Sequence, residues 1–286
     1  MEYKDLKWEV RENPNRTGEN SIGILTLNRP DFLNAINVRM RVELDILCDE
    51  VAHNSNIKVI IITGEGRGFS AGGDLKSEAD PLGAGEENFD FGNFGAYKEI
   101  ANYFFNDLRH QVLQRAFKKF EDLPCIVIAA INGPAAGGGM NMALACDMRL
   151  GCEKTLFSES FVKIGLIPDW GGFESLTRLV GTAKTMELMM TGDRVGAEEA
   201  YRLGLLNQIF PMDGFMEQVQ VFAERLASGP AQAITAIKQG VYGAVGGSLE
   251  TVLDFEHQNQ AALILSDDSR EGIRAFLEKR QPKFGA

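Results

Sequence analysis

The sequence lacks any long hydrophobic run. No stretch of its 286 residues reaches the roughly 18 uninterrupted apolar residues that a membrane-spanning helix needs. The first residues, MEYKDLKWEVRENP, are polar and contain no apolar signal core. We therefore expect a cytoplasmic protein that does not insert into a membrane.

Basic residues are also scarce. The chain has 29 Lys and Arg against 40 Asp and Glu, which gives a net charge of −11. Nucleic acids and anionic lipids both attract a positive protein face, so neither is an expected partner. With 44% hydrophobic and 24% charged residues, the composition is typical of a globular protein with a sizeable core. An anionic ligand would have to be held by local groups.

Several chemical motifs are missing. The four cysteines show neither CxxC nor Cys/His spacing, which predicts buried free thiols rather than a metal site or a disulfide framework. They are Cys48, Cys125, Cys146 and Cys152. The sequence contains neither GxGxxG after a first strand nor GxxxxGK[ST], so it has no common nucleotide-binding loop.

The first half of the chain alternates strand-like and helix-like segments. Residues Ile22–Leu27, Lys58–Thr63 and Cys125–Ile131 are short apolar or alternating runs, whereas Val38–Ala52 has a helical period. Short apolar strands separated by helices are typical of a sheet that is covered on both faces. The pattern predicts an α/β core built from βαβ units over residues 1–196.

Two further regions differ from this core. Residues 75–96 are rich in glycine and acid and have no period, which predicts a long inserted loop of the kind that often contacts ligands. Residues 197–286 are nearly all helical in pattern, with only Leu206–Phe210 extended. This last third is predicted to be a helical appendage that covers the core or a neighbouring subunit.

Glycines gather after two of the predicted strands. Residues 64–74 follow KVIIIT and residues 133–139 follow CIVIAAI. Glycines at strand ends allow a positive φ and bring bare N–H groups close to a ligand. The second loop opens a helix, so several free N–H groups would point at whatever binds there. The loops predict either an oxyanion hole, in which two N–H groups hold one carbonyl oxygen, or merely tight turns.

The motifs of these loops resemble the crotonase (enoyl-CoA hydratase/isomerase) superfamily. The similarity extends over almost the whole chain and includes LNRPDFLNAI, GRGFSAGGDL, IAAINGPAAGGGMNMALACDMR, GLIPDWGG and MELMMTGDRVGAEEAYRLGLLNQIFP. The resemblance implies a spiral of ββα units with a C-terminal helical trimerisation region, assembled as a homotrimer or homohexamer. It also implies an acyl-CoA thioester substrate, an enolate intermediate, and no metal or redox cofactor.

The resemblance also implies roles for particular residues. The oxyanion N–H groups correspond to Gly73 and Gly138, and Ala71, Gly72, Gly73 and Asp74 line the CoA site. The two glutamates of the family's hydratases correspond here to Asn141 and Phe161. An amide and a benzene ring can neither take a proton from water nor give one to carbon, so a two-glutamate hydratase is not expected.

Asp169, in GLIPDWGG, is the remaining candidate for proton transfer. An aspartate at this position is similar to that of the double-bond isomerases, including the ring-epoxyphenylacetyl-CoA isomerase branch, and to the nucleophile of 4-chlorobenzoyl-CoA dehalogenase. Phe161 and Trp170 are expected to form pocket walls whose apolar surroundings raise the pKa of Asp169. Asn141 is predicted to orient the substrate.

Several alternatives stay open at this stage. Asp169 follows a proline and could be only a turn residue. His110, Glu159 or Glu174 could supply a second acid or base. The preferred function is an enoyl-CoA isomerase; the alternatives are a hydratase, a hydrolase or dehalogenase that uses Asp169, and a non-catalytic CoA-binding homologue.

Overall fold

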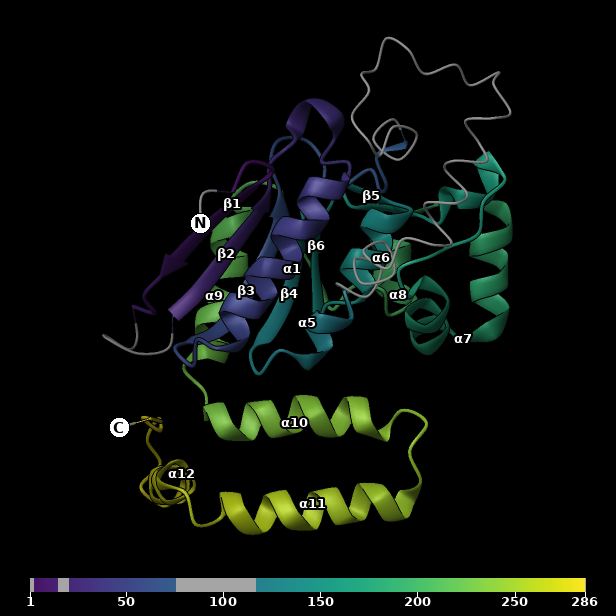
Figure 1. The fold of residues 1–286 in the computed structure, drawn as a ribbon. Coiled ribbons are helices and arrows are strands. Elements are labelled where there is room, and N and C mark those ends of the chain that lie inside the picture. The colour runs from purple at the N-terminus through teal and green to yellow at the C-terminus, as the bar shows by residue number, and fades with distance from the viewer. Residues whose placement is uncertain (1–2, 15–20, 76–116, 286) are drawn as a thin grey trace.

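The computed structural model describes residues 3–14, 21–75 and 117–285. Figure 1 shows an α/β body with the C-terminal helices lying beneath it. The inserted loop predicted after Leu75, and His110, lie outside the described residues. In the part of the chain that is described, no helix is both long enough and apolar enough to cross a membrane.

A six-stranded sheet forms the centre of the body. Its strands, in spatial order, are β1 (Leu6–Arg11), β2 (Ser21–Leu27), β3 (Ile57–Gly64), β4 (Ile126–Ile131), β6 (Met148–Cys152) and β9 (Gln208–Phe210). β1 pairs antiparallel with β2, and every later pair is parallel. The α/β prediction is confirmed.

A smaller sheet lies beside the first. It contains β5 (Pro134–Ala136), β7 (Leu156–Ser158) and β8 (Arg194–Gly196), with β5 and β7 parallel. β4 and β5 lead into helix α6 (Gly138–Leu144), whereas β6 and β7 lead through the 3₁₀ turn η3 (Ser160–Ile164) into α7 (Gly172–Thr191). Each of these turns gives one strand to each sheet and then a helix, which is the expected ββα spiral.

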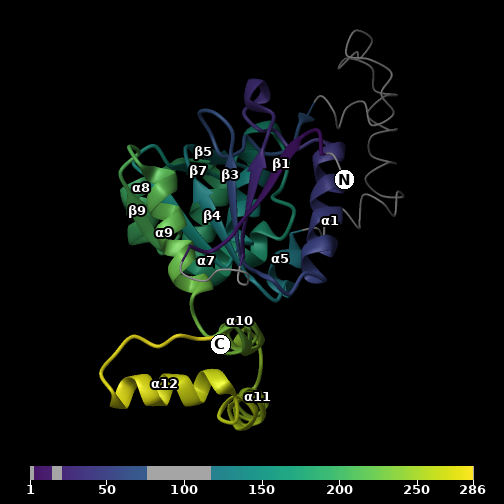
Figure 2. The ribbon, with the colours of Figure 1, turned by 90° about the vertical axis from the view of Figure 1, so that its left-hand side faces the viewer.

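Helices cover the large sheet on both faces, as Figure 2 shows for α1 (Val38–Ala52) and α9 (Phe215–Ala227). The side chains of successive residues in β3 therefore pack into two different hydrophobic clusters, one on each face of the sheet. Ile60 and Ile62 pack in the cluster that contains α1, while Val59 and Ile61 pack in the cluster that contains α9. Burial on both faces explains why this strand is a continuous apolar run.

Local sequence signals set the ends of α1. The side-chain oxygen of Asn37 accepts a 2.7 Å hydrogen bond from the Met40 amide, which caps the helix. The other elements of the body are η1 (Pro30–Phe32), α5 (Lys118–Asp122) and α8 (Ala197–Arg202). Helices α8 and α9 and strand β9 all pack on the body, so the helices beneath the body begin with α10. The predicted boundary at residue 196, between the core and the helical region, stays a prediction.

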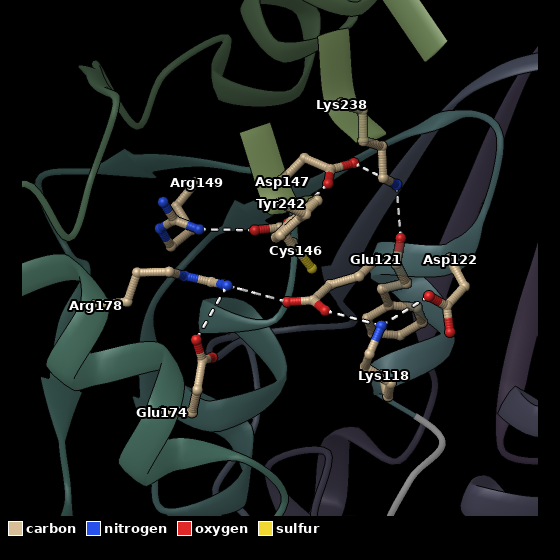
Figure 3. Close-up of polar contacts among 11 residues, drawn as sticks. Lys118, Glu121, Asp122, Cys146, Asp147, Arg149, Glu174, Arg178, Lys238 and Tyr242 are labelled. Atoms are coloured by element: carbon tan, nitrogen blue, oxygen red, sulfur yellow. Dashed lines mark hydrogen bonds and ion pairs between the residues drawn. The ribbon is translucent and has the colours of Figure 1, made fainter. Parts of the chain in front are cut away.

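The three lower helices are α10 (Ala231–Ala244), α11 (Leu249–Leu263) and α12 (Asp267–Leu277), which we call the arm. A buried polar network fixes α10 to the body (Figure 3). The Lys238 ammonium lies 2.8 Å from the Asp147 carboxylate and also donates to the carbonyls of Phe120 and Cys125. The Tyr242 hydroxyl donates to the other Asp147 oxygen. The arm therefore meets the body in a defined register.

Candidate active site

Two glycine loops meet at the ends of β3 and β4. The amides of Phe69 and Ser70 both donate to the carbonyl of Pro134, at 3.0 and 3.2 Å. In return, the Ala136 amide donates to the Ser70 carbonyl at 2.9 Å. Main-chain hydrogen bonds thus hold the two loops side by side, ahead of helix α6.

Glycine is needed where the loops approach most closely. Gly72 has φ +95°, and a Cβ atom there would lie 2.6 Å from the Ala136 carbonyl oxygen and 3.1 Å from the Gly138 nitrogen. A Cβ atom on Gly139 would overlap the Ser70 carbonyl. The glycines therefore do more than turn the chain, because they allow the two backbones into contact.

The amides of Gly73 and Gly138 are available to a ligand. The chain is fixed on both sides of Gly73, since the Ile36 amide donates to the Gly72 carbonyl and the Asp74 amide donates to the Ile36 carbonyl. Within the described residues, neither the Gly73 nor the Gly138 amide donates a hydrogen bond. Gly138 is also the first residue of α6, where helix amides lack an internal partner. Their use as an oxyanion hole remains a proposal.

The predicted CoA loop has one buried ion pair. The carboxylate of Asp74 lies 2.7 Å from the Arg29 guanidinium, and both side chains are largely shielded from solvent. Ala71 is exposed, and its amide donates to the Leu33 carbonyl. The ion pair gives Asp74 a structural partner, while contacts of residues 71–74 with CoA stay a prediction.

A tight turn carries Asp169. The Asp169 carbonyl accepts hydrogen bonds from the Gly172 amide at 3.0 Å and from the Asn141 side-chain amide at 2.8 Å. Trp170 and Gly171, the two central residues, have φ +50° and +83°. Two successive left-handed residues form a turn of the type I′ class, in which a tryptophan is strained.

The ring of Trp170 places this turn against the glycine loop. A Cβ atom on Gly138 would overlap the indole, so the ring lies directly on residue 138. The Phe117 ring meets the indole edge-on at 5.3 Å, and the Arg41 guanidinium lies 5.5 Å from its centre. Because Trp170 directly follows Asp169, this contact places the Asp169 turn beside Gly138, as expected from the sequence.

The surroundings of Asp169 suit proton transfer. Burial raises the pKa of its carboxyl from 3.8 to about 6, and the nearby charge of Arg41 opposes part of that rise. The direction agrees with the expectation from the sequence. A carboxyl that titrates near neutrality can accept a proton and return it at physiological pH.

Glu159, one of the three candidates for a second acid or base, is buried close to Asp169. Its side chain is 1% exposed, and neither carboxyl oxygen has a hydrogen-bond partner in the described part of the chain. Burial first, and the charge of Asp169 second, raise its pKa from 4.5 to about 8. Its position directly after the β7 strand could have signalled burial, had that three-residue strand been recognised.

Unsatisfied polar atoms concentrate around these acids. Buried atoms without a partner among the described residues include Asn141 Oδ1, both Glu159 oxygens, Asp169 Oδ1 and Trp170 Nε1. Native proteins leave few such groups, so a cluster of them needs an explanation. A bound substrate that supplies the missing partners is such an explanation.

The remaining candidates lie around this cluster. Phe161 forms a wall beside the loop, because a Cβ atom on Gly137 would contact its ring at 3.5 Å. Glu174 is exposed and pairs with Arg178 at 3.2 Å, which disfavours it as a second acid. A neighbouring cavity of about 630 Å³ is lined on one side by Phe117 and Trp170 and also by Tyr242 of α10.

The ββα spiral and the two joined glycine loops agree with the crotonase superfamily, which the sequence motifs resemble. The family model for enoyl-CoA hydratase/isomerase matches residues 17–286, so the chain belongs to this family and is an enzyme of it. The predicted fold class is confirmed by solved structures. The chain aligns with subunit I of an enoyl-CoA hydratase from Geobacillus kaustophilus at a TM-score of 0.82 and 31% identity, covering 99% of each chain.

Relatives carry both hydratase and isomerase names. The chain is 36% identical over 267 residues to the 1,2-epoxyphenylacetyl-CoA isomerase of Escherichia coli, covering 93% of this chain and 95% of the relative. It is 34% identical over 284 residues to a probable enoyl-CoA hydratase of Rhodobacter capsulatus, covering 99% of both. Family membership thus leaves the reaction to be argued from the site.

Proposed function

We propose that the chain is an enoyl-CoA isomerase that shifts a double bond in an acyl-CoA thioester. The observation that carries this proposal is the placement of Asp169, a partly buried carboxyl on a turn that packs on Gly138. The amides of Gly73 and Gly138 would hold the thioester oxygen, where negative charge develops. Coenzyme A enters as part of the substrate.

The reaction needs one base and one oxyanion site. For a 3-enoyl thioester, the Asp169 carboxylate takes a proton from the α-carbon, and the electron pair moves onto the thioester oxygen as a dienolate. A proton then adds to the γ-carbon and the double bond becomes α,β. No atoms are gained or lost. Amide donors and carboxyls suffice for these steps, so we propose that the enzyme needs no metal or redox cofactor.

The identity of residues 141 and 161 supports isomerisation over hydration by the family's usual pair of acids. The side-chain amide of Asn141 is committed to the Asp169 carbonyl, and Phe161 has no acidic group. Water addition remains the second candidate because of the buried Glu159, which lies within the electrostatic influence of Asp169. The products separate the two reactions.

A panel of straight-chain, cyclic and aromatic CoA thioesters, analysed by mass spectrometry, tests the proposal. Isomerisation leaves the mass unchanged while the enoyl absorbance changes, hydration adds one water, and hydrolysis releases free CoA. We expect a mass-neutral conversion. Exclusive addition of water, or release of CoA, would replace the proposed reaction, and no conversion of any thioester would favour a binding role.

We also propose that the arm assembles subunits into a trimer or a hexamer. Its exposed apolar side chains include Leu249, Leu253, Leu265, Phe276 and Leu277, with Phe276 83% exposed. Apolar surface of this extent is typical of an interface. We propose that other copies of this chain cover these apolar side chains.

A further inference from the structure

Burial of the Glu159 carboxyl destabilises the folded protein. The side chain is 1% exposed, yet neither oxygen meets a donor among the described residues. A buried polar group without a partner destabilises the folded state, whereas an apolar side chain of the same shape would not. Such groups persist where function requires them.

The backbone places Glu159 beside the glycine loop. Strand β7 pairs with β5 so that Ser158 is the partner of Ala136, and the Gly137 amide donates to the Ser158 carbonyl at 2.8 Å. Glu159 is the next residue after this pair, at the level of Gly137. The following residues stay close, because a Cβ atom on Gly137 would lie within 3.8 Å of Ser160 and Phe161.

Two acids therefore come from segments that both pack on the glycine loop. Asp169 comes from the turn before α7, whose Trp170 ring lies on Gly138. Glu159 directly follows β7, next to Ser158, whose carbonyl accepts the hydrogen bond from the Gly137 amide. The charge of Asp169 disfavours ionisation of Glu159 and, together with burial, raises its pKa. The pair thus holds one proton more readily than it loses both.

This acid is not one that the family resemblance assigns. The hydratase glutamate of that segment corresponds to Phe161, two residues further along the chain. Position 159 is therefore distinct from both positions at which the family's hydratases carry a glutamate. It gives the site a second acid from a different backbone position.

We propose that Glu159 is the second proton carrier of the site, which donates to the γ-carbon of the dienolate while Asp169 takes the α-proton. This rests on the proposed function and deepens it. Asp169 ends the step protonated and Glu159 ends it ionised. Transfer of one proton from Asp169 to Glu159 restores the starting state, so protons and electrons balance over the cycle.

Glu159→Gln tests the role, with Glu187→Gln as the control. Both changes replace a glutamate by its neutral isostere, but Glu187 is exposed and paired with Lys184. We expect Glu159→Gln to lower kcat at least about tenfold with little change in KM, and Glu187→Gln to leave kcat unchanged. Equal kcat in both variants and the wild type would overturn the proposal while leaving Asp169 as the base.

Solvent deuterium gives a second readout. In D₂O, the wild-type product should carry deuterium at the γ-carbon from the first turnover, because Glu159 exchanges with solvent. The residual turnover of Glu159→Gln should instead return the substrate's own proton through Asp169 alone. Unchanged deuterium content in that variant would contradict a donor role for Glu159.

Stability separates a catalytic from a structural role without any assay of isomerisation. We expect Glu159→Leu to raise Tm while it lowers kcat as Glu159→Gln does, whereas replacement of a structural glutamate would lower Tm. The infrared band of a protonated carboxyl should be present at neutral pH in the wild type and missing in Glu159→Gln. If the thioester panel reveals another reaction, the proposed function fails, and the same variants compared in that reaction still decide whether Glu159 carries a proton.

Discussion

The side-chain amide of Asn141 donates a 2.8 Å hydrogen bond to the backbone carbonyl of Asp169. Asn141 lies on α6, in the turn that follows the glycine loop, and its side chain packs so closely that a Cβ atom on Gly172 would overlap it. One residue thus ties the strained Asp169 turn to the helix that begins at Gly138. The geometry favours positioning of Asp169 over the direct orientation of substrate expected from the sequence.

Replacement of Asn141 should therefore act through Asp169. Asn141→Leu keeps similar size but removes the donor, so the turn loses a constraint and the carboxyl moves from its productive place. We expect kcat to fall about 10- to 100-fold, with a small change in KM for a CoA thioester in steady-state kinetics. A raised KM with unchanged kcat would instead assign Asn141 to substrate binding.

Asp169→Asn keeps the shape of the side chain and removes the base. We expect kcat to fall by about 10²–10⁴-fold, while binding of a CoA thioester, measured by calorimetry, changes little because the proposed CoA contacts lie in residues 71–74. Substrate hydrogen exchange with D₂O should be lost as well. An aspartyl ester labelled by H₂¹⁸O in the wild type would indicate a nucleophile instead of a proton carrier.

Gly138→Ala should damage the site through a defined collision. The added methyl group would overlap the Trp170 indole, which can yield only by displacing the Asp169 turn. Since loss of one oxyanion donor costs about 10²–10³ in rate, we expect a comparable fall in kcat. Gly196→Ala is the control, because a Cβ atom there meets no other atom within 4 Å. Gly138→Ala with normal kcat would show that the loop is only a turn.

The rate should depend on pH through both acids. The base Asp169 must be ionised, so kcat/KM should rise as the pH passes its raised pKa of about 6. Glu159 must be protonated, so the rate should fall above its raised pKa of about 8. The guanidinium of Arg41 also lies close enough to Asp169 to lower the pKa of its carboxyl. The alkaline fall should be missing in Glu159→Gln, and a fall that persists there would come from another group.

Light scattering at micromolar concentration tests the assembly. We expect a mass of three subunits or a multiple of three, because the arm exposes apolar side chains that the body does not cover. Charge substitution at two of them, Leu265→Glu with Phe276→Glu, should shift the mass toward the monomer. A wild-type monomer at this concentration would refute the proposed interface.

Much of the fold was predictable because its long elements have strong periods. The helix Val38–Ala52 is observed with the predicted bounds, and the strand at Ile57–Gly64 extends the prediction by one residue at each end. The strand Leu6–Arg11 was missed, because an edge strand with polar residues resembles a solvated terminus. The three-residue strands of the small sheet are too short to show any period.

Some residues of the candidate site could be proposed from the sequence, whereas others could not. Gly73, Gly138 and Asp169 were proposed from the family resemblance of their motifs, and their roles stay predictions; the structure does bring the two glycine loops together. Glu159 could not be ranked from its sequence context. Its importance comes from burial and from the charge of a residue in another segment, which no local pattern encodes.

The pairing of Lys238 with Asp147 constrains how this protein can be recombined with its relatives. Lys238 belongs to the arm and Asp147 to the body, and each would be a buried charge without its partner. A chimera that exchanges the arm alone keeps its fold only if the donor sequence supplies a matching cation. Two positions that are distant in the chain therefore have to be exchanged together in any such chimera.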